Sequence, residues 1–122
     1  MRVYCSGPMT GKPDLNRPAF DAATKRLREQ GHFVIDPHDL TPIFGTSEAI
    51  AKSFEELYDP AYFESAVRPS LAKCIMDADL AAVRSCDAIY LLRGWENSRG
   101  AKKELAEALA HGLQVMQEGG EE

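Results

Sequence analysis

A loop in the last third of the chain combines the features of an anion-binding site with a carboxylate. The loop Gly94-Trp-Glu-Asn-Ser-Arg-Gly-Ala-Lys-Lys-Glu104 follows the strand-like run Asp87–Leu92 and leads directly into a helix. Ser98 is a good helix N-cap, Gly100 lets a ligand approach the backbone closely, and the free N–H groups of a first helical turn bind anions. Glu104 lies on the same helix face as Gly100 because side chains at i and i+4 are neighbours. An anion site beside a carboxylate predicts a phosphorylated substrate with a group to be attacked.

Short β-prone runs alternate with stretches of helical periodicity, and these elements must position the loop. The first run, Arg2–Ser6, is stopped by Gly7-Pro8, and Asp14 or Asn16 is available to cap the next helix. In chain order the predicted elements are a strand over 2–6, a helix that ends at Gly31, a strand over 32–36, a helix over 69–85, a strand over 87–92, a helix over 98–111 and a strand over 113–116.

This alternation predicts an α/β fold, here a single-domain Rossmann-like or flavodoxin-like parallel sheet flanked by helices. We expect one domain over residues 1–116 and a flexible, glycine-rich tail over 117–122. Ligands of such sheets bind at the carboxyl ends of the strands. The loops after 2–6 and 87–92 are therefore expected to form the site.

Residues 38–66 interrupt the alternation. Their prolines and glycine indicate a short helix and a loop, and the segment carries four aromatic residues: Phe54, Tyr58, Tyr62 and Phe63. We interpret this segment as an insertion that partly covers the site or contacts a second subunit. The aromatic stretch 54–63 is the candidate interface of a homo-oligomer.

The net charge and the distribution of charged and apolar residues limit the kinds of molecule that the chain could bind. The chain has 122 residues and a formal net charge of −5, and it contains no Lys/Arg cluster that could follow a nucleic-acid backbone. A small anionic ligand is compatible with this balance, whereas a nucleic-acid duplex is not expected. No leader precedes the first strand and no window approaches the roughly 18 apolar residues of a membrane span. We therefore expect a cytoplasmic protein with no membrane partner.

No metal or cofactor is expected. Cys5, Cys74 and Cys86 lack any C-x-x-C or C-x-x-H spacing, which is typical of small core residues in a reducing compartment. The histidines show no ligand spacing, so none is assigned to chemistry. The run over 7–13 resembles a Walker A loop only superficially, and the pattern G-x-G-x-x-G is absent. Neither ATP hydrolysis nor hydride transfer is predicted.

Several motifs, taken together, resemble a known family. These are Tyr4-Cys-Ser-Gly-Pro-Met-Thr-Gly11, Asp79-Leu80, Cys86-Asp-Ala-Ile-Tyr90 and the loop Gly94–Glu104. In this order they are similar to the nucleoside 2-deoxyribosyltransferase-like superfamily, and within it to a small, DUF4406-like branch of phages and bacteria whose hallmark is the loop Ser6–Gly11. The resemblance covers most of the chain except 38–66.

Members of that superfamily cleave the N-glycosidic bond of deoxynucleosides or nucleoside monophosphates. The resemblance implies that Glu104 is the nucleophile and that Ser98, six residues earlier, holds a 5′-phosphate. It also implies that Asp79 contacts the sugar or the base, with Asp77 as a substitute, and that Tyr4 orients the nucleophile. Relatives build their sites from two subunits, which implies a homo-oligomer.

Other residues complete the predicted substrate site. They come from the two loops, and with Ser98 they are Ser6, Gly7, Pro8, Met9, Trp95, Asn97, Arg99 and Gly100. Trp95 is either a stacking surface beside the site or a contact with a neighbouring subunit. The chain departs from characterised members in the cations Arg99, Lys102 and Lys103 and in Pro8-Met9 of the first loop, and these departures leave the substrate open.

The chemistry also follows from the residues. Breaking a ribosyl C1′–N bond passes through an oxocarbenium-like transition state, which one carboxylate can stabilise or attack while a second protonates the base. Glu104 would be the nucleophile and Asp79 the acid or orienting group. Resolution by water makes the enzyme a hydrolase, and resolution by a second base makes it a transferase.

Each assignment has a structural alternative. On the structural alternative, Glu104 is a solvated helix residue and Tyr4 is a core residue. Ser98 is then only a helix cap, and Asp79 is a surface charge paired with Lys73 or Arg84. We expect an enzyme that cleaves the N-glycosidic bond of a nucleoside or nucleoside 5′-monophosphate. The alternative is a non-catalytic nucleotide-binding or sensing module on the same fold.

Overall fold

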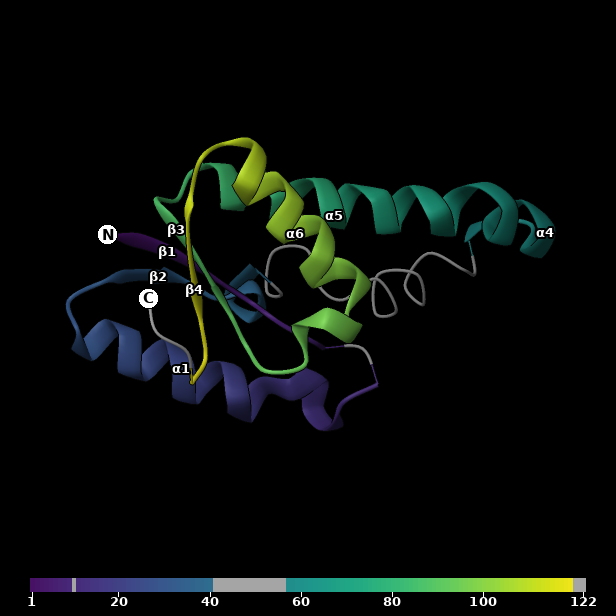
Figure 1. The fold of residues 1–122 in the computed structure, drawn as a ribbon. Coiled ribbons are helices and arrows are strands. Elements are labelled where there is room, and N and C mark those ends of the chain that lie inside the picture. The colour runs from purple at the N-terminus through teal and green to yellow at the C-terminus, as the bar shows by residue number, and fades with distance from the viewer. Residues whose placement is uncertain (10, 41–56, 120–122) are drawn as a thin grey trace.

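The centre of the molecule is a four-stranded parallel sheet. The structure, a computed structural model, describes residues 1–9, 11–40 and 57–119. The strands are β1 (Arg2–Ser6), β2 (Phe33–Ile35), β3 (Ala88–Leu91) and β4 (Gln114–Gln117), in the spatial order β2-β1-β3-β4. All neighbouring pairs are parallel, so the predicted α/β class is confirmed (Figure 1). The order agrees with the flavodoxin-like, doubly wound arrangement.

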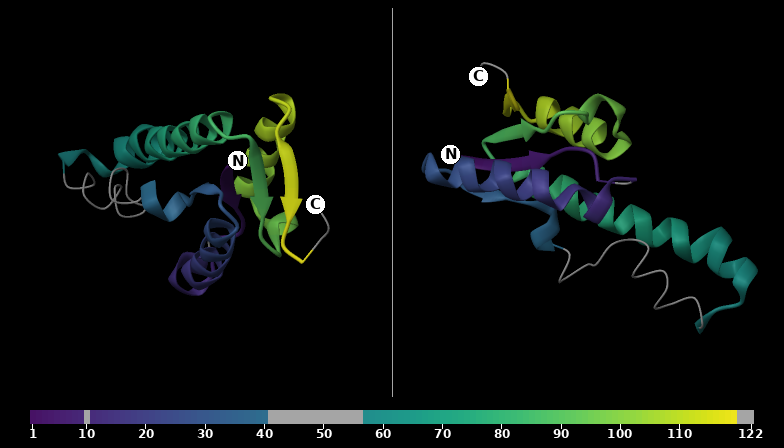
Figure 2. Two further views of the ribbon diagram at one scale, coloured as in Figure 1. Left: turned by 90° about the vertical axis from the view of Figure 1, so that its left-hand side faces the viewer. Right: turned by 90° about the horizontal axis from the view of Figure 1, so that it is seen from below.

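Helices cover both faces of the sheet. Figures 1 and 2 show α1 (Arg17–Glu29) on one face and α5 (Arg68–Arg84) and α6 (Arg99–Ala110) on the other. Short helical turns complete the described residues: η1 (Pro13–Asn16), η2 (Pro37–Leu40), α4 (Pro60–Tyr62), η4 (Phe63–Val67) and η5 (Trp95–Asn97).

Alternation along β1 divides the core in two. Val3 and Cys5 belong to the buried cluster on the α1 side, whereas Tyr4 belongs to the cluster under α5 and α6. Because successive strand side chains point to opposite faces, Ser6 shares the face of Tyr4. This alternation puts two hydroxyl groups under the helix that carries Glu104.

The helix ends follow local signals, with one exception. Ser98 caps α6 as predicted, since its hydroxyl accepts a hydrogen bond from the N–H of Ala101 at 3.2 Å. Gly31, with a φ of 92°, follows the end of α1, where a left-handed residue is favoured. The prediction that Asp14 or Asn16 caps α1 is wrong: Asn16 has a φ of 61° and its amide donates to the Pro8 carbonyl at 2.9 Å.

The helical run before β3 begins earlier than predicted. Asp59 caps a continuous run of α4, a π-type turn (η4) and α5, with Pro60 in the first turn, so residues 60–67 are helical rather than part of a separate loop. A carboxylate cap followed by proline is a normal helix start. Residues 41–56, including Phe54, lie outside the described residues.

The N-terminal half of α5 extends beyond the sheet, as the right-hand view of Figure 2 shows. Cys74 lies in this part and is exposed, so the prediction that all three cysteines are core residues is wrong for it, whereas Cys5 and Cys86 are buried. Helical periodicity alone cannot tell where a sheet ends beneath a helix.

The C-terminal strand continues past its predicted end. Gln117 belongs to β4, and the Glu118 N–H donates to the Leu91 carbonyl at 2.9 Å. The Glu118 carboxylate accepts a hydrogen bond from the Arg93 N–H at 3.0 Å. The tail predicted from residue 117 is thus ordered through Glu118, and residues 120–122 lie outside the described residues.

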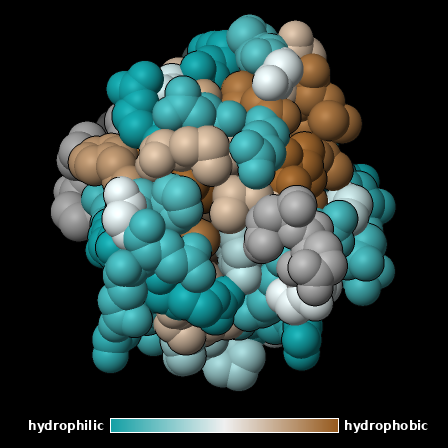
Figure 3. All heavy atoms as spheres, turned by 60° about the vertical axis from the view of Figure 1, so that its left-hand side comes forward, coloured by the Kyte–Doolittle hydropathy of each residue, from teal (hydrophilic) through white to brown (hydrophobic). Residues whose placement is uncertain are grey.

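Part of the surface is apolar. On the face drawn in Figure 3, hydrophobic side chains (brown) gather at the upper right. Leu109 of α6 is 60% exposed, and Leu113 and Val115 are partly buried beside the core under α5 and α6. None of the helices in the described parts of the chain has the length and apolar character needed to cross a membrane.

Candidate active site

The sheet order defines where a ligand would bind. From β1 the chain moves outward to β2 on one side, while β3 and β4 lie on the other. Such a reversal opens a crevice at the carboxyl ends of the two central strands, and this is the usual ligand position in open α/β sheets. Here those ends are Ser6 of β1 and Leu91 of β3.

Glu104 is held at this position by two hydroxyl groups. Tyr4 donates its hydroxyl hydrogen to Glu104 Oε2 at 2.7 Å, and Ser6 donates to Oε1 at 2.6 Å. All three residues are buried, and Glu104 is only 6% exposed. The reading of Glu104 as a solvated helix residue is therefore wrong, and Tyr4 is at once a core residue and a partner of the carboxylate.

Burial changes the acidity of this carboxylate. Loss of solvation raises the pKa of Glu104 to about 7, the hydrogen bonds from Ser6 and Tyr4 oppose the rise, and the negative charge of Asp79 adds to it. Burial, followed by the charges of Glu104 and Asp79, raises the pKa of Tyr4 well above its usual value. Tyr4 is therefore a hydrogen-bond donor rather than a base.

Asp79 is the second carboxylate of the site. It projects from α5, is partly buried, and burial raises its pKa to about 6. Its charge acts on both Glu104 and Tyr4. The cations considered as its surface partners are engaged elsewhere: Lys73 pairs with Asp77 at 3.2 Å, and Arg84 pairs with Glu107 at 2.7 Å.

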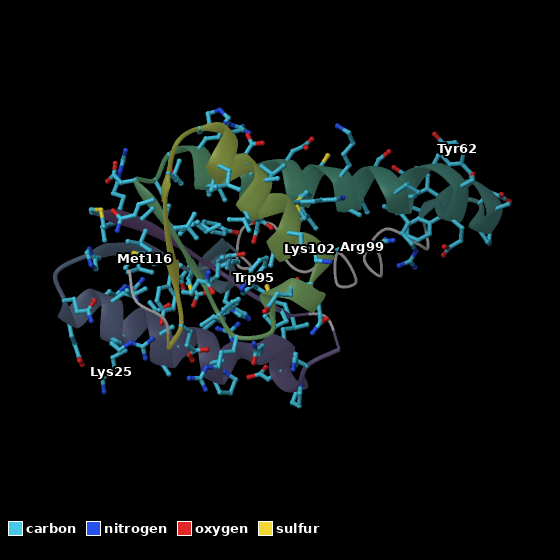
Figure 4. All side chains as sticks on the ribbon, in the orientation of Figure 1. Lys25, Tyr62, Trp95, Arg99, Lys102 and Met116 are labelled. Atoms are coloured by element: carbon cyan, nitrogen blue, oxygen red, sulfur yellow. The ribbon has the colours of Figure 1, made fainter. Side chains whose placement is uncertain are left out.

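The predicted anion site is the first turn of α6, the helix that also carries Glu104. A Cβ added to Gly100 would meet only Met76 Cε at 3.6 Å, which is an ordinary contact distance. Arg99, Lys102 and Lys103 are exposed. Figure 4 shows Arg99 and Lys102 close together at the first turn of α6, with Trp95 on the preceding loop. The turn thus combines a helix N-terminus, whose Ala101 N–H is bonded to Ser98, with cationic side chains.

The two loops of the site pack against each other. A Cβ on Gly7 would come within 2.7 Å of Leu92 Cβ, so only glycine fits where β1 leaves the sheet. Pro8 lies beside Gly94, whose φ of 89° suits glycine. Trp95 packs on the core under α5 and α6.

Two of the predicted loop contacts differ from Glu104 in their surroundings. Met9 packs against the α1-side core, on the opposite face of the sheet. Asn97 is exposed in η5. Ser6, predicted as a substrate contact, instead holds Glu104, and the signal that it could do so was its spacing of two residues from Tyr4 on one strand.

Among the residues described, no cluster of three or more His, Cys, Asp or Glu side chains is arranged to hold a metal ion. The groups that the structure brings together at the site are two carboxylates, two hydroxyl groups and a helix N-terminus.

Fold and site together define an α/β protein with a buried, hydroxyl-held carboxylate at the switch point of a parallel sheet. The family model described as Domain of unknown function (DUF4406) matches residues 1–60 and 46–117. The chain belongs to this family, and the predicted resemblance to it is confirmed. None of the curated proteins matches the chain.

Proposed function

We propose that the chain cleaves the N-glycosidic bond of a nucleoside or nucleoside 5′-monophosphate through Glu104, as a member of the nucleoside 2-deoxyribosyltransferase-like superfamily. The observation that carries the proposal is the fixed, buried carboxylate of Glu104, with both oxygens oriented by Tyr4 and Ser6 and with Asp79 close enough to affect its pKa. Two carboxylates with raised pKa values in one crevice are typical of acid–base sites.

In the proposed reaction Glu104 attacks C1′ of the sugar. The C1′–N bond breaks as a C1′–O bond to the carboxylate forms, and Asp79 gives its proton to the departing base. Water then attacks C1′, Asp79 takes the proton from that water, and Glu104 leaves as a carboxylate. A second base in place of water would give a transferase.

The phosphate of a monophosphate substrate would bind at the start of α6. Ser98, the N–H groups of the first turn and Gly100 form the backbone part of this site, and Arg99 and Lys102 supply positive charge. Trp95 lies on the loop before α6, and its indole ring offers a flat surface on which a base would stack. No duplex, membrane or cofactor is part of the proposal.

The test is release of free base from a panel of ribo- and deoxyribonucleosides and their monophosphates. The near-isosteric variant is Glu104→Gln, and Glu107→Gln on the same helix is the matched control, since Glu107 pairs with Arg84 at the surface. Release by the wild type and by Glu107→Gln, but not by Glu104→Gln, would support the proposal. Equal release by Glu104→Gln and wild type would refute it.

One observation favours the second candidate, a non-catalytic nucleotide sensor. Both Glu104 oxygens already accept hydrogen bonds, which weakens a carboxylate as a nucleophile. If no member of the panel releases base but one nucleotide binds saturably, the sensor is supported and Glu104 becomes a ligand contact.

The proposal includes a homo-oligomer. The exposed side chains at the start of the helical run are Leu57, Tyr58 and Tyr62, at 71%, 39% and 55% exposure. The rings of Tyr58 and Tyr62 lie 6.0 Å apart and form an apolar tip. Light scattering on wild type and Tyr62→Ser tests it: a smaller species for the variant supports this interface, and a monomeric wild type contradicts it.

A further inference from the structure

A buried histidine lies outside the proposed chemistry and is linked to the loop after β1. His38 follows β2 and is 3% exposed, as is Asp36. The backbone N–H of His38 donates to Asp36 Oδ1 at 2.9 Å, and Nδ1 of its ring lies 2.9 Å from the same oxygen. On the other side, Nε2 lies 3.0 Å from the carbonyl oxygen of Leu15.

Both ring nitrogens of His38 face acceptors. A carbonyl oxygen can only accept, so Nε2 carries the hydrogen of the bond to Leu15. The ring therefore joins the carboxyl group of Asp36 to the Leu15 carbonyl. Phe20 is fully buried, and its ring centroid lies 4.7 Å from that of His38. The phenyl ring thus packs against the histidine ring between its two polar partners.

The segment that His38 holds has an unusual backbone. Asp14, Leu15 and Asn16 have φ values of 51°, 52° and 61°, a left-handed conformation that residues with side chains rarely adopt in succession. Such a conformation persists only where the surroundings impose it. The Leu15 carbonyl, in the middle of the three, is the atom that His38 binds.

The same segment reaches the candidate active site. The Asn16 amide donates to the Pro8 carbonyl at 2.9 Å. Pro8 lies against Gly94, and Gly7 packs on Leu92, so the loop after β1 packs against the loop after β3. A chain of contacts therefore runs from His38 to the loops after β1 and β3, at the end of the sheet where Ser6 holds Glu104.

We propose that His38, which bridges Asp36 and the Leu15 carbonyl, is a positioning residue that fixes the β1 loop (residues 7–9 and 11–16) as one wall of the site. That this wall meets the substrate rests on the proposed function. That His38 fixes the loop does not.

Two substitutions separate the two ends of the contact. In His38→Asn the side-chain amide can still donate to Asp36 but is too short for Leu15, whereas in His38→Gln the amide nitrogen reaches toward the Leu15 carbonyl. Asp39→Asn is the control, because Asp39 is an exposed neighbour that pairs with Arg28 at 3.5 Å.

The first readout is the state of the ring. Nitrogen-15 NMR of the imidazole is expected to show a hydrogen on Nε2 of His38, the nitrogen that faces the Leu15 carbonyl. A ring with no hydrogen on Nε2 would overturn the proposal.

The second readout is amide hydrogen exchange, which needs no substrate. The Lys12 and Leu15 amides, bonded to Met9 O and Lys12 O, report on the loop, and the Leu92 amide, bonded to Ser6 O, reports on the sheet. In His38→Asn the loop amides should exchange about tenfold faster, the effect of one lost buried hydrogen bond, with the Leu92 amide unchanged. His38→Gln should restore much of the protection. Unchanged loop exchange in His38→Asn, or equal acceleration of loop and sheet, would overturn the proposal.

The third readout links the loop to function. With a nucleotide that the base-release panel identifies, His38→Asn should raise KM about tenfold while kcat changes little, because the wall moves but Glu104 does not. A fall in kcat at constant KM would contradict a positioning role. If no nucleotide is cleaved, the proposed function fails while the exchange results still decide the role of His38.

Discussion

The hydroxyl of Tyr4 donates to Glu104 across 100 residues of sequence, at 2.7 Å. Ser6, two residues further along the same strand, donates to the other oxygen of the carboxylate at 2.6 Å. A strand and a helix from opposite ends of the chain thus fix the plane of one carboxyl group.

Removing the Tyr4 hydroxyl should make Glu104 a weaker acid. The hydrogen bond from Tyr4 lowers the pKa of Glu104, so Tyr4→Phe should raise this pKa and move the acidic limb of the pH–rate profile to higher pH. At pH 6 base release should fall about tenfold, the effect of one hydrogen bond to a charged group. Ser6→Ala, which removes the other bond, should shift the limb in the same direction. An unmoved limb in both variants would show that the titrating group is not Glu104.

Stability should depend on pH through Glu104. Its pKa in the folded protein, about 7, lies above the ordinary glutamate value of 4.5, so the folded state binds more protons between these pH values. The contribution of this group to the free energy of unfolding is therefore largest below pH 4.5 and is lost as the pH rises to about 7. Glu104→Gln imitates the neutral form and should be more stable than wild type at pH 8 by about 3 kcal/mol, with no advantage at pH 4. Urea unfolding at the two pH values measures this, and an equal difference at both would contradict it.

Asp79 should control the basic limb of activity. As the proposed acid, Asp79 must be protonated, so its contribution to activity should fall as the pH rises above about 6. Glu104 must be ionised, so its contribution should fall as the pH drops below about 7. Because the acid has the lower pKa, the form with Asp79 protonated and Glu104 ionised is a minor species, and its population peaks in a narrow bell between these values. In Asp79→Asn the basic limb should disappear. The acidic limb should also move to lower pH, because the charge that raises the pKa of Glu104 is gone. A bell that keeps both limbs would exclude Asp79 as the acid.

Gly100 and Gly7 should respond to alanine in opposite ways. A Cβ at Gly100 meets only Met76 Cε at 3.6 Å, and alanine favours a helix, so Gly100→Ala should keep or slightly raise stability. If a phosphate binds at this turn, nucleotide affinity should nevertheless fall about tenfold because the backbone can no longer approach it. Gly7→Ala should instead destabilise the fold by about 1–3 kcal/mol, since its Cβ would lie 2.7 Å from Leu92 Cβ. Thermal unfolding and nucleotide titration of both variants separate the effects.

Local patterns in the sequence were sufficient for the strands and for the helix that carries Glu104. The β-prone runs over 2–6 and 87–92 are short and bounded by glycine or proline, and Ser98 is a standard cap, so these elements lie within a residue or two of prediction. The pairing of Glu104 with Tyr4 was expected from the family resemblance. It was not expected from spacing, which carries no information across so many residues.

Other features depend on tertiary contacts that no local pattern records. Asn16 has the chemistry of a cap, but a left-handed backbone turns its amide toward Pro8 instead. Cys74 has helical spacing with its apolar neighbours, yet it is exposed, because the N-terminal half of α5 extends beyond the sheet. His38 lacks ligand spacing because its partners are a carboxylate two residues away and a carbonyl from an earlier loop. Only the folded chain brings these groups together.

The position of β1 between β2 and β3 has a consequence for synthesis. Of the four strands of this sheet, β1 leaves the ribosome before the others, and it can pair with β2 early, but its other neighbour begins at Ala88. Until then one edge of an apolar strand is open, with Tyr4 and Ser6 still without their carboxylate partner. Open edges of this kind recruit other chains, and pairings distant in sequence form slowly. The nascent chain should therefore be most prone to aggregate while β3 is still inside the ribosome, and a chaperone that covers β1 during this interval should raise the yield of folded protein.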